Sequence, residues 1–190
     1  MRERGVMSAA AANVSGEATP EARPSRAIRL IRVGVLLVAA IAIAFSATMH
    51  EQLGFDLTVA ALALAGIGVA HVIEATAPAS AGRRTVPALL AGVALFAAVL
   101  VPMSATAIGF AVVIAAWSLV SALLEFLGNA IRPGSRPDVI IVGASGFLLA
   151  LFVLLARQDQ VAILGFFGGY AVIAGVFLGI SAFDTQRESR

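Results

Sequence analysis

The 190-residue chain contains no cysteine and no lysine, and it has few charged residues of any kind. Without cysteine it can form no disulfide, no thiolate metal site and no cysteine nucleophile. Charged residues make up 13% of the chain, whereas roughly 25% is usual in soluble domains. Hydrophobic residues make up 60%, and the mean hydropathy is +0.98. This composition predicts a polytopic membrane protein with no separate soluble domain.

Motifs for catalysis are also missing. The sequence has no Gly-rich phosphate loop and no serine with a base at a recognisable spacing, and its two histidines, His50 and His71, form no metal-ligand cluster. Membrane topology explains the arginines, so we do not expect nucleic-acid binding. We therefore expect no enzymatic activity, no cofactor and no metal. The expected partner is the lipid bilayer, and a homo-oligomer is compatible with the sequence.

The clearest membrane-spanning segment is the uncharged run from Val161 to Phe183. At 1.5 Å per residue such a run crosses a hydrocarbon core about 30 Å thick. It contains four glycines at three-, seven- and four-residue steps, which bring them toward one side of a helix. Small residues let membrane helices approach closely. We therefore predict a helix-packing surface made of Gly165, Gly168, Gly175 and Gly179.

Six spans account for the apolar runs. They cover about 27–48, 57–75, 139–156 and 161–183, and two more lie in the uncharged stretch between Arg84 and Glu125, with a turn at 101–104 around Pro102. Residues 26–185 are thus predicted as a six-helix transmembrane domain. Residues 1–25 are predicted as a disordered cytoplasmic tail and 186–190 as a cytoplasmic C-terminus. A cleaved signal peptide is less consistent with the long charged leader.

The arginines predict the orientation and a repeat. Arg32, Arg84 and Arg136 stand 52 residues apart, near the starts of odd-numbered spans, so the predicted fold is all-α with three repeated helical hairpins. Ten arginines flank the spans on one side, whereas only Arg157 lies on the other, which places both termini in the cytoplasm. The ten are Arg23, Arg26, Arg29, Arg32, Arg83, Arg84, Arg132, Arg136, Arg187 and Arg190.

The layout of six short spans as three hairpins, together with the closing run GFFGGYAVIAGVFLGISAFD at 165–184, resembles the HdeD family of small bacterial inner-membrane proteins associated with acid resistance. The resemblance covers about residues 29–184. It implies a bacterial inner-membrane location and a role in tolerance of acid or envelope stress. It supplies no catalytic or ligand-binding residue.

Three ionisable residues are candidates for handling protons: His71, Glu74 and Glu125. Ionisable groups inside membrane spans are functional candidates by default. The alternative is that they only form ion pairs near the membrane surface. Glu74, Glu125 and Asp184 all lie at predicted helix C-termini, where the helix dipole disfavours negative charge, so we expect each to pair with an arginine at the start of an odd-numbered span.

Two aromatic residues, Trp117 and Tyr170, lie near the middle of their spans and are expected to face inward, with Ser118, Ser121 or a backbone carbonyl as hydrogen-bond partner. A ligand or lipid cavity would be an alternative environment for them. Two functional classes follow from the sequence. The first is a non-enzymatic, stress-related membrane protein that acts through packing, oligomerisation or partners. The second is a small transporter or proton-linked channel that uses Glu125, Glu74 and His71.

Overall fold

The computed structural model describes residues 26–50, 52–78, 84–130 and 137–184. All regular secondary structure in these residues is helical, which confirms the all-α prediction. The predicted cytoplasmic segments, 1–25 and 186–190, lie outside the described residues.

Three helical hairpins follow one another along the chain, as predicted. The first comprises α2 (Arg26–Phe45), a 3₁₀ turn η1 (Ala47–Met49) and α3 (Leu53–Thr76). The second comprises α4 (Thr85–Met103) and α5 (Ala107–Ala130). The third comprises α6 (Pro137–Leu155) and α7 (Gln160–Asp184).

The turn of the second hairpin lies two to three residues later than predicted. Helix α4 continues through Pro102 to Met103, and the chain reverses at Ala105, whose φ is 51°. Pro102 has no N–H to donate to the carbonyl four residues earlier, so the helix loses one backbone bond in its last turn and ends one residue later. The Ser104 hydroxyl and backbone N–H both donate to the Val101 carbonyl, which closes that turn.

Among the described residues, five helices, α2, α3, α4, α5 and α7, are long and apolar enough to cross a membrane. The apolar part of α6 that fits the same description, Ile140–Leu155, is shorter. Large apolar side chains cover the outside of the bundle, including Val38, Leu62 and Phe96, each about two-thirds exposed. Helices satisfy their own backbone hydrogen bonds, so this apolar exterior is suited to lipid. The chain is a polytopic helical membrane protein.

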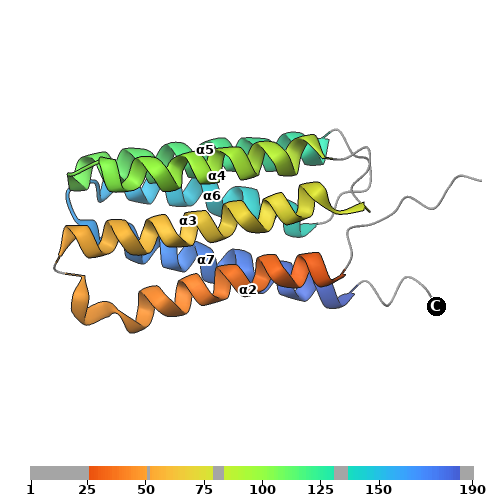
Figure 1. Ribbon diagram of the computed structural model, residues 1–190, viewed down its shortest axis with the longest axis horizontal. Helices are drawn as coiled ribbons and strands as arrows, with labels where there is room; N and C mark the ends of the chain where they lie inside the picture. Colours follow the sequence, from red (N-terminus) through yellow and green to blue (C-terminus); the bar gives the residue numbers. More distant parts are fainter. Residues whose placement is uncertain (1–25, 51, 79–83, 131–136, 185–190) are drawn as a thin grey trace, which may run out of the picture.

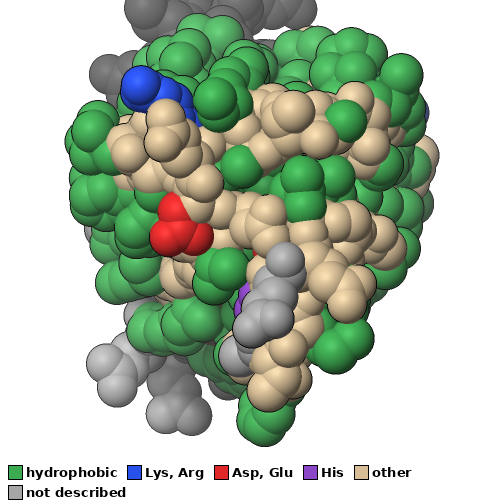
Figure 2. Space-filling view, turned by 90° about the vertical axis from the view of Figure 1, so that its left-hand side faces the viewer, with side chains coloured by type: hydrophobic (Ala, Val, Ile, Leu, Met, Phe, Trp, Pro, Cys, Tyr) green, Lys and Arg blue, Asp and Glu red, His purple; other side chains and the backbone are tan. Residues whose placement is uncertain are grey.

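The helices α2 to α7 form a ring in which the last helix returns to the first, so that α7 packs along α2 (Figure 1). The closest packing joins helices of different hairpins: α3 with α4, α5 with α6, and α7 with α2. We call the end where α2 begins and α7 ends the terminal end, and the opposite end the far end. Figure 2 looks onto the far end, where charged side chains cover little of the surface.

A layer of fully buried apolar side chains fills the half of the bundle nearer the far end. Phe110 and Ile114 of α5 belong to the same core cluster as Phe167 of α7. Trp117 packs edge-on against the Phe167 ring, with 5.5 Å between ring centroids. Such edge-to-face contacts add about 0.5–1.5 kcal/mol to the burial of the rings. This apolar layer, which also includes Leu64, Val101, Val153, Ile163 and Leu164, separates the two ends of the ring.

Three of the four glycines in the predicted packing surface of α7 lie close to α2. A Cβ on Gly175 would lie 3.0 Å from Leu37 Cδ2, one on Gly168 would lie 3.1 Å from Ile43, and one on Gly179 would lie 3.6 Å from Val33. These glycines therefore form the contact with α2.

Gly165 does not belong to this contact. A Cβ on Gly165 would meet no described atom of a neighbouring helix within 4 Å. The pairing of Gly168 with Ile43 would place Gly165 opposite residues beyond Phe45, where α2 has already ended.

Candidate functional site

A partly buried ion-pair network joins three helices near the terminal end. The guanidinium of Arg32 on α2 donates from Nη2 to Glu125 Oε1 on α5 at 3.0 Å and from Nη1 to Glu74 Oε2 on α3 at 3.3 Å. The three side chains are only 16–18% exposed. We call Arg32, Glu74, Glu125 and the adjacent His71 the Arg32 cluster.

The helix geometry explains why these groups meet. Arg32 lies in the second turn of α2, whereas Glu74 and Glu125 lie near the C-termini of α3 and α5. The antiparallel hairpins bring these three positions to one membrane level. Each glutamate would otherwise face the negative end of its own helix dipole, and the guanidinium compensates both. The predicted pairing of Glu74 and Glu125 with an arginine that begins an odd-numbered span is confirmed. The side chain of Asp184 lies outside the described residues.

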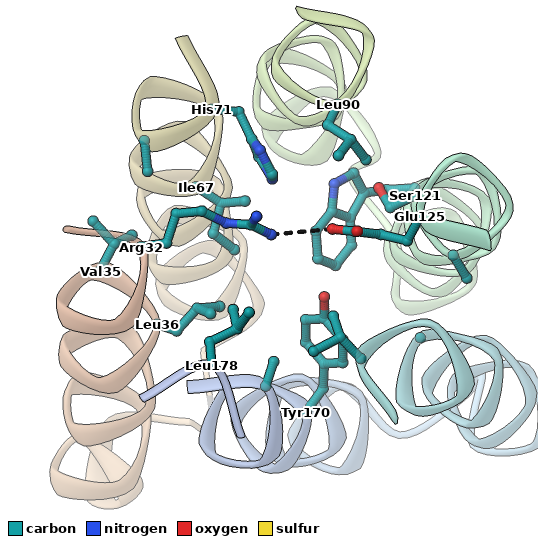
Figure 3. Close-up of a pocket in the computed structure, with 16 residues that line it drawn as sticks. Arg32, Val35, Leu36, Ile67, His71, Leu90, Ser121, Glu125, Tyr170 and Leu178 are labelled. Carbon is teal, nitrogen blue, oxygen red and sulfur yellow. Dashed lines mark hydrogen bonds and ion pairs between the residues drawn. The ribbon is translucent and has the colours of Figure 1, made fainter. Parts of the chain in front are cut away.

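His71 lies one turn before Glu74 on α3 and is 5% exposed. Its Nδ1 is 3.6 Å from Glu74 Oε2, which is close enough for electrostatic attraction but too long for a hydrogen bond. Nδ1 accordingly has no hydrogen-bond partner among the described residues. Figure 3 shows the His71 ring, the Glu125 carboxylate, the Tyr170 hydroxyl and the Arg32 guanidinium pointing toward one central space.

That space is a cavity of about 30 Å³ lined by residues of α2, α3, α4, α5, α6 and α7. Trp117, Ser121 and Glu125 line it from one face of α5, four residues apart, and Tyr170 lines it from α7. The cavity exists because small residues occupy much of the remaining wall. These are Ala70, Ala122, Gly146 and Ala174.

Trp117 is 4% exposed, which confirms that it faces inward, and Tyr170 is partly buried against it with ring centroids 5.7 Å apart. The expected serine partner for Trp117 is not found, because its indole Nε1 has no hydrogen-bond partner in the described part of the chain. Ser118 instead donates to the Ala115 carbonyl of its own helix. A buried polar group left without a partner costs about 1–3 kcal/mol. The cavity thus borders two such groups, the Trp117 indole and the His71 imidazole.

A second buried polar site occupies the far end. His50 Nδ1 lies 2.7 Å from Asp56 Oδ1, and His50 Nε2 lies 2.9 Å from the Ile43 carbonyl at the C-terminus of α2. Asp56 is completely buried, and its Oδ2 has no partner among the residues that the structure describes. Gln160 of α7 donates to the His50 carbonyl at 3.1 Å, which ties the third hairpin to this turn.

The two hydrogen-bond partners of the His50 ring indicate where the protons of the His50–Asp56 pair lie. A carbonyl can only accept, so Nε2 carries a hydrogen and donates to Ile43. Nδ1 then either donates to the Asp56 carboxylate as part of an imidazolium or accepts from a protonated Asp56. In both arrangements one proton is shared between the ring and the carboxyl group.

Sequence reasoning identified the members of the Arg32 cluster but not the buried state of Asp56. The sequence places His50 and Asp56 in a short polar segment between two spans, which is typical of an exposed turn. A signal was present in the i, i+6 spacing of a histidine and an aspartate at a membrane boundary. The cavity could have been suspected from the four-residue spacing of Trp117, Ser121 and Glu125.

No protein-family model, curated protein or solved structure matches the chain. Within the described residues, no group of three or more potential metal ligands was found. The Arg32 cluster with its cavity is therefore the candidate functional site on geometric grounds.

Proposed function

We propose that this is a non-enzymatic protein of the bacterial inner membrane that contributes to tolerance of acid or envelope stress, and that the Arg32 cluster is its proton-responsive part. In this proposal both termini are cytoplasmic, so the cluster lies at the cytoplasmic end of the bundle. The resemblance of the closing helix to the HdeD family suggests the physiological role.

The observation that carries the proposal is the sharing of one guanidinium by two partly buried carboxylates from different hairpins. Protonation of Glu125 would remove its charge and its ion pair with Arg32. Because that pair spans α2 and α5, the change would alter how the first and second hairpins are held together. A fall in pH would thus be converted into a change in helix packing.

A cavity of about 30 Å³ is too small for a metabolite, since ligand pockets are typically about 300–1,000 Å³. This size favours a proton-responsive bundle over a solute transporter. The second candidate function, a proton-linked channel, is favoured by one observation: His71, Glu74 and Glu125 converge on the same cluster. In the structure, the apolar layer around Phe110 and Phe167 lies between this cluster and the far end.

The test compares acid survival and membrane abundance in an acid-sensitive bacterial strain that expresses the protein or its variants. We expect Glu125→Gln to remain abundant and folded while losing acid protection, because the amide cannot change its charge. Asp159→Asn is the matched control, because it also changes an acid to an amide, but at the far end. The Ala162 N–H donates to Asp159 Oδ1, and the asparagine oxygen can accept the same hydrogen bond. Full protection by Glu125→Gln would contradict the proposal.

Proton flux in proteoliposomes that contain only the purified protein separates the two candidates. The proposed function predicts no flux above that of empty liposomes. A channel predicts flux that Glu125→Gln abolishes. Gly175→Leu serves as the packing control, because it should lower membrane abundance and acid protection together.

A further inference from the structure

The central cavity presents polar groups that the protein itself leaves without partners. The Trp117 indole Nε1–H and His71 Nδ1 are buried and make no hydrogen bond within the described residues. Both residues line the cavity, together with Ser121, Glu125 and Tyr170. A ligand that satisfies both groups must accept a hydrogen bond from the indole and also exchange one with the imidazole, which can act as donor or acceptor.

The size and polarity of the cavity fit water. A water needs about 10–15 Å³ of cavity and two to four polar partners, so a cavity of about 30 Å³ holds about two waters. Its wall offers six polar side chains from four helices: Arg32 of α2, His71 of α3, Trp117, Ser121 and Glu125 of α5, and Tyr170 of α7. An apolar cavity of similar size would stay dry, but this one is lined by donors and a carboxylate.

Charge argues against a metal cation or an inorganic anion in the same space. The Arg32 guanidinium already forms an ion pair with the Glu125 carboxylate at 3.0 Å, and its positive charge would repel a metal ion there. Glu74 and Glu125 would in turn repel an anion. The other titratable groups of the lining are His71 and Tyr170. The lining residues of α4 and α6, namely Leu90, Val142 and Gly146, are uncharged. Arg29, one turn before Arg32, is the next charged residue on α2.

We infer that the cavity binds one or two water molecules that bridge the Trp117 indole and the His71 imidazole to the Glu125 carboxylate. These waters link the two candidate proton-binding groups, which approach the cavity from different helices. The water site stands on the geometry of the cavity. Its role in passing a proton between His71 and Glu125 rests on the proposed function. In that step a proton leaves the imidazolium for the bridging water, and another leaves that water for the carboxylate.

Trp117 is the only tryptophan in the chain, so its indole N–H gives a single, unambiguous probe. The experiment uses ¹⁵N-labelled full-length protein in lipid nanodiscs and measures magnetisation transfer from water to the indole proton. We expect a direct water cross peak in the wild-type protein. Its absence in the wild type would show a dry cavity and overturn the inference.

Two cavity-filling variants identify the source of the signal. Ala174→Val and Ala70→Val each add two methyl groups to the cavity wall and should weaken or abolish the cross peak. Ala162→Val, on α7 near the far end, is the control and should leave it unchanged. A cross peak that persists at full strength in both filled variants would mean that the water lies elsewhere, which also overturns the inference.

The link to the proton is read from the pH dependence of the same signal. We expect the indole ¹⁵N shift to titrate in the wild type and in Asp159→Asn, but the titration to be lost or displaced in Glu125→Gln. A cross peak with no titration would retain the water site and overturn its link to Glu125. Neither measurement depends on acid survival, so a failure of the proposed function is distinguished from a failure of this site.

Discussion

The two ends of the bundle each contain buried ionisable groups, but they are built in opposite ways. In the Arg32 cluster, Arg32 contacts Glu74 and Glu125, which follow it in the sequence by 42 and 93 positions, so the cluster connects three helices. The pair of His50 and Asp56 joins residues six positions apart within one hairpin. The first therefore holds separate hairpins together, whereas the second shapes a turn and caps the C-terminus of α2 through the Ile43 carbonyl.

This difference bears on stability as well as on function. A long-range ion pair is formed only when the ring is assembled, so its loss should affect the whole bundle. A local pair is lost when a single turn opens, which proteins do with much less free energy than global unfolding. The two sites are also separated by distance: Asp56 and His71 lie 15 residues apart on α3, about 22 Å along the helix axis.

The largest expected effect comes from Arg32→Met, which keeps an unbranched apolar stem but leaves Glu74 and Glu125 without their shared partner. Breaking a buried ion pair from one side costs about 3–5 kcal/mol. We expect a strongly lowered melting temperature in detergent and loss of protection from hydrogen exchange across several helices. A melting temperature equal to that of the wild type would mean that the cluster does not hold the hairpins together.

A smaller and more local effect is expected for Asp56→Asn at the far end. The substitution keeps the shape of the side chain but removes the charge that can bind an imidazolium, and a hydrogen bond to a charged group contributes about 1.5–3 kcal/mol. We expect faster hydrogen exchange in the turn between α2 and α3, with the terminal half of the bundle unchanged. Uniformly faster exchange throughout the bundle would remove the distinction between the two ends.

The contact of α2 with α7 runs between the two ends and can be tested with a matched pair of glycines. Gly175→Leu should force Leu37 aside and cost about 1–3 kcal/mol, because overpacking a close helix contact displaces side chains. Gly165→Leu on the same helix meets open space and should be neutral or slightly stabilising. Thermal melting and oligomer size in detergent check both variants; equal destabilisation by the two would contradict the assignment of the contact.

The smallest effect is expected for Arg26→Ala at the terminal end. The Arg26 guanidinium lies over the Phe183 ring, with Cζ 4.5 Å from the ring centroid, and thereby links the start of α2 to the end of α7. An exposed cation–π contact contributes about 0.5–1 kcal/mol. We expect a slight decrease in melting temperature, far below that of Arg32→Met. A comparable decrease would show that positive charge at this end matters more than the buried network.

Much of the candidate site could be predicted from residue chemistry, because charged groups in a membrane span must find partners. This requirement led correctly from Glu74 and Glu125 to an arginine at the start of an odd-numbered span. It did not predict that one arginine, Arg32, would contact both acids. The burial of Asp56 was missed, because an aspartate next to a predicted loop is normally solvated, and only the fold of η1 brings His50 against it.

The sequence by itself determined the helices, the three hairpins and the membrane class, because hydrophobicity over about 20 residues and the breaks between such runs act locally along the chain. Only the tertiary structure decided which helices touch. The closure of the ring places α7 against α2, moves Gly165 out of the contact, and brings Trp117, His71 and Glu125 around one cavity. These relations depend on helix rotation and on the packing of residues far apart in the chain, and no local pattern encodes them.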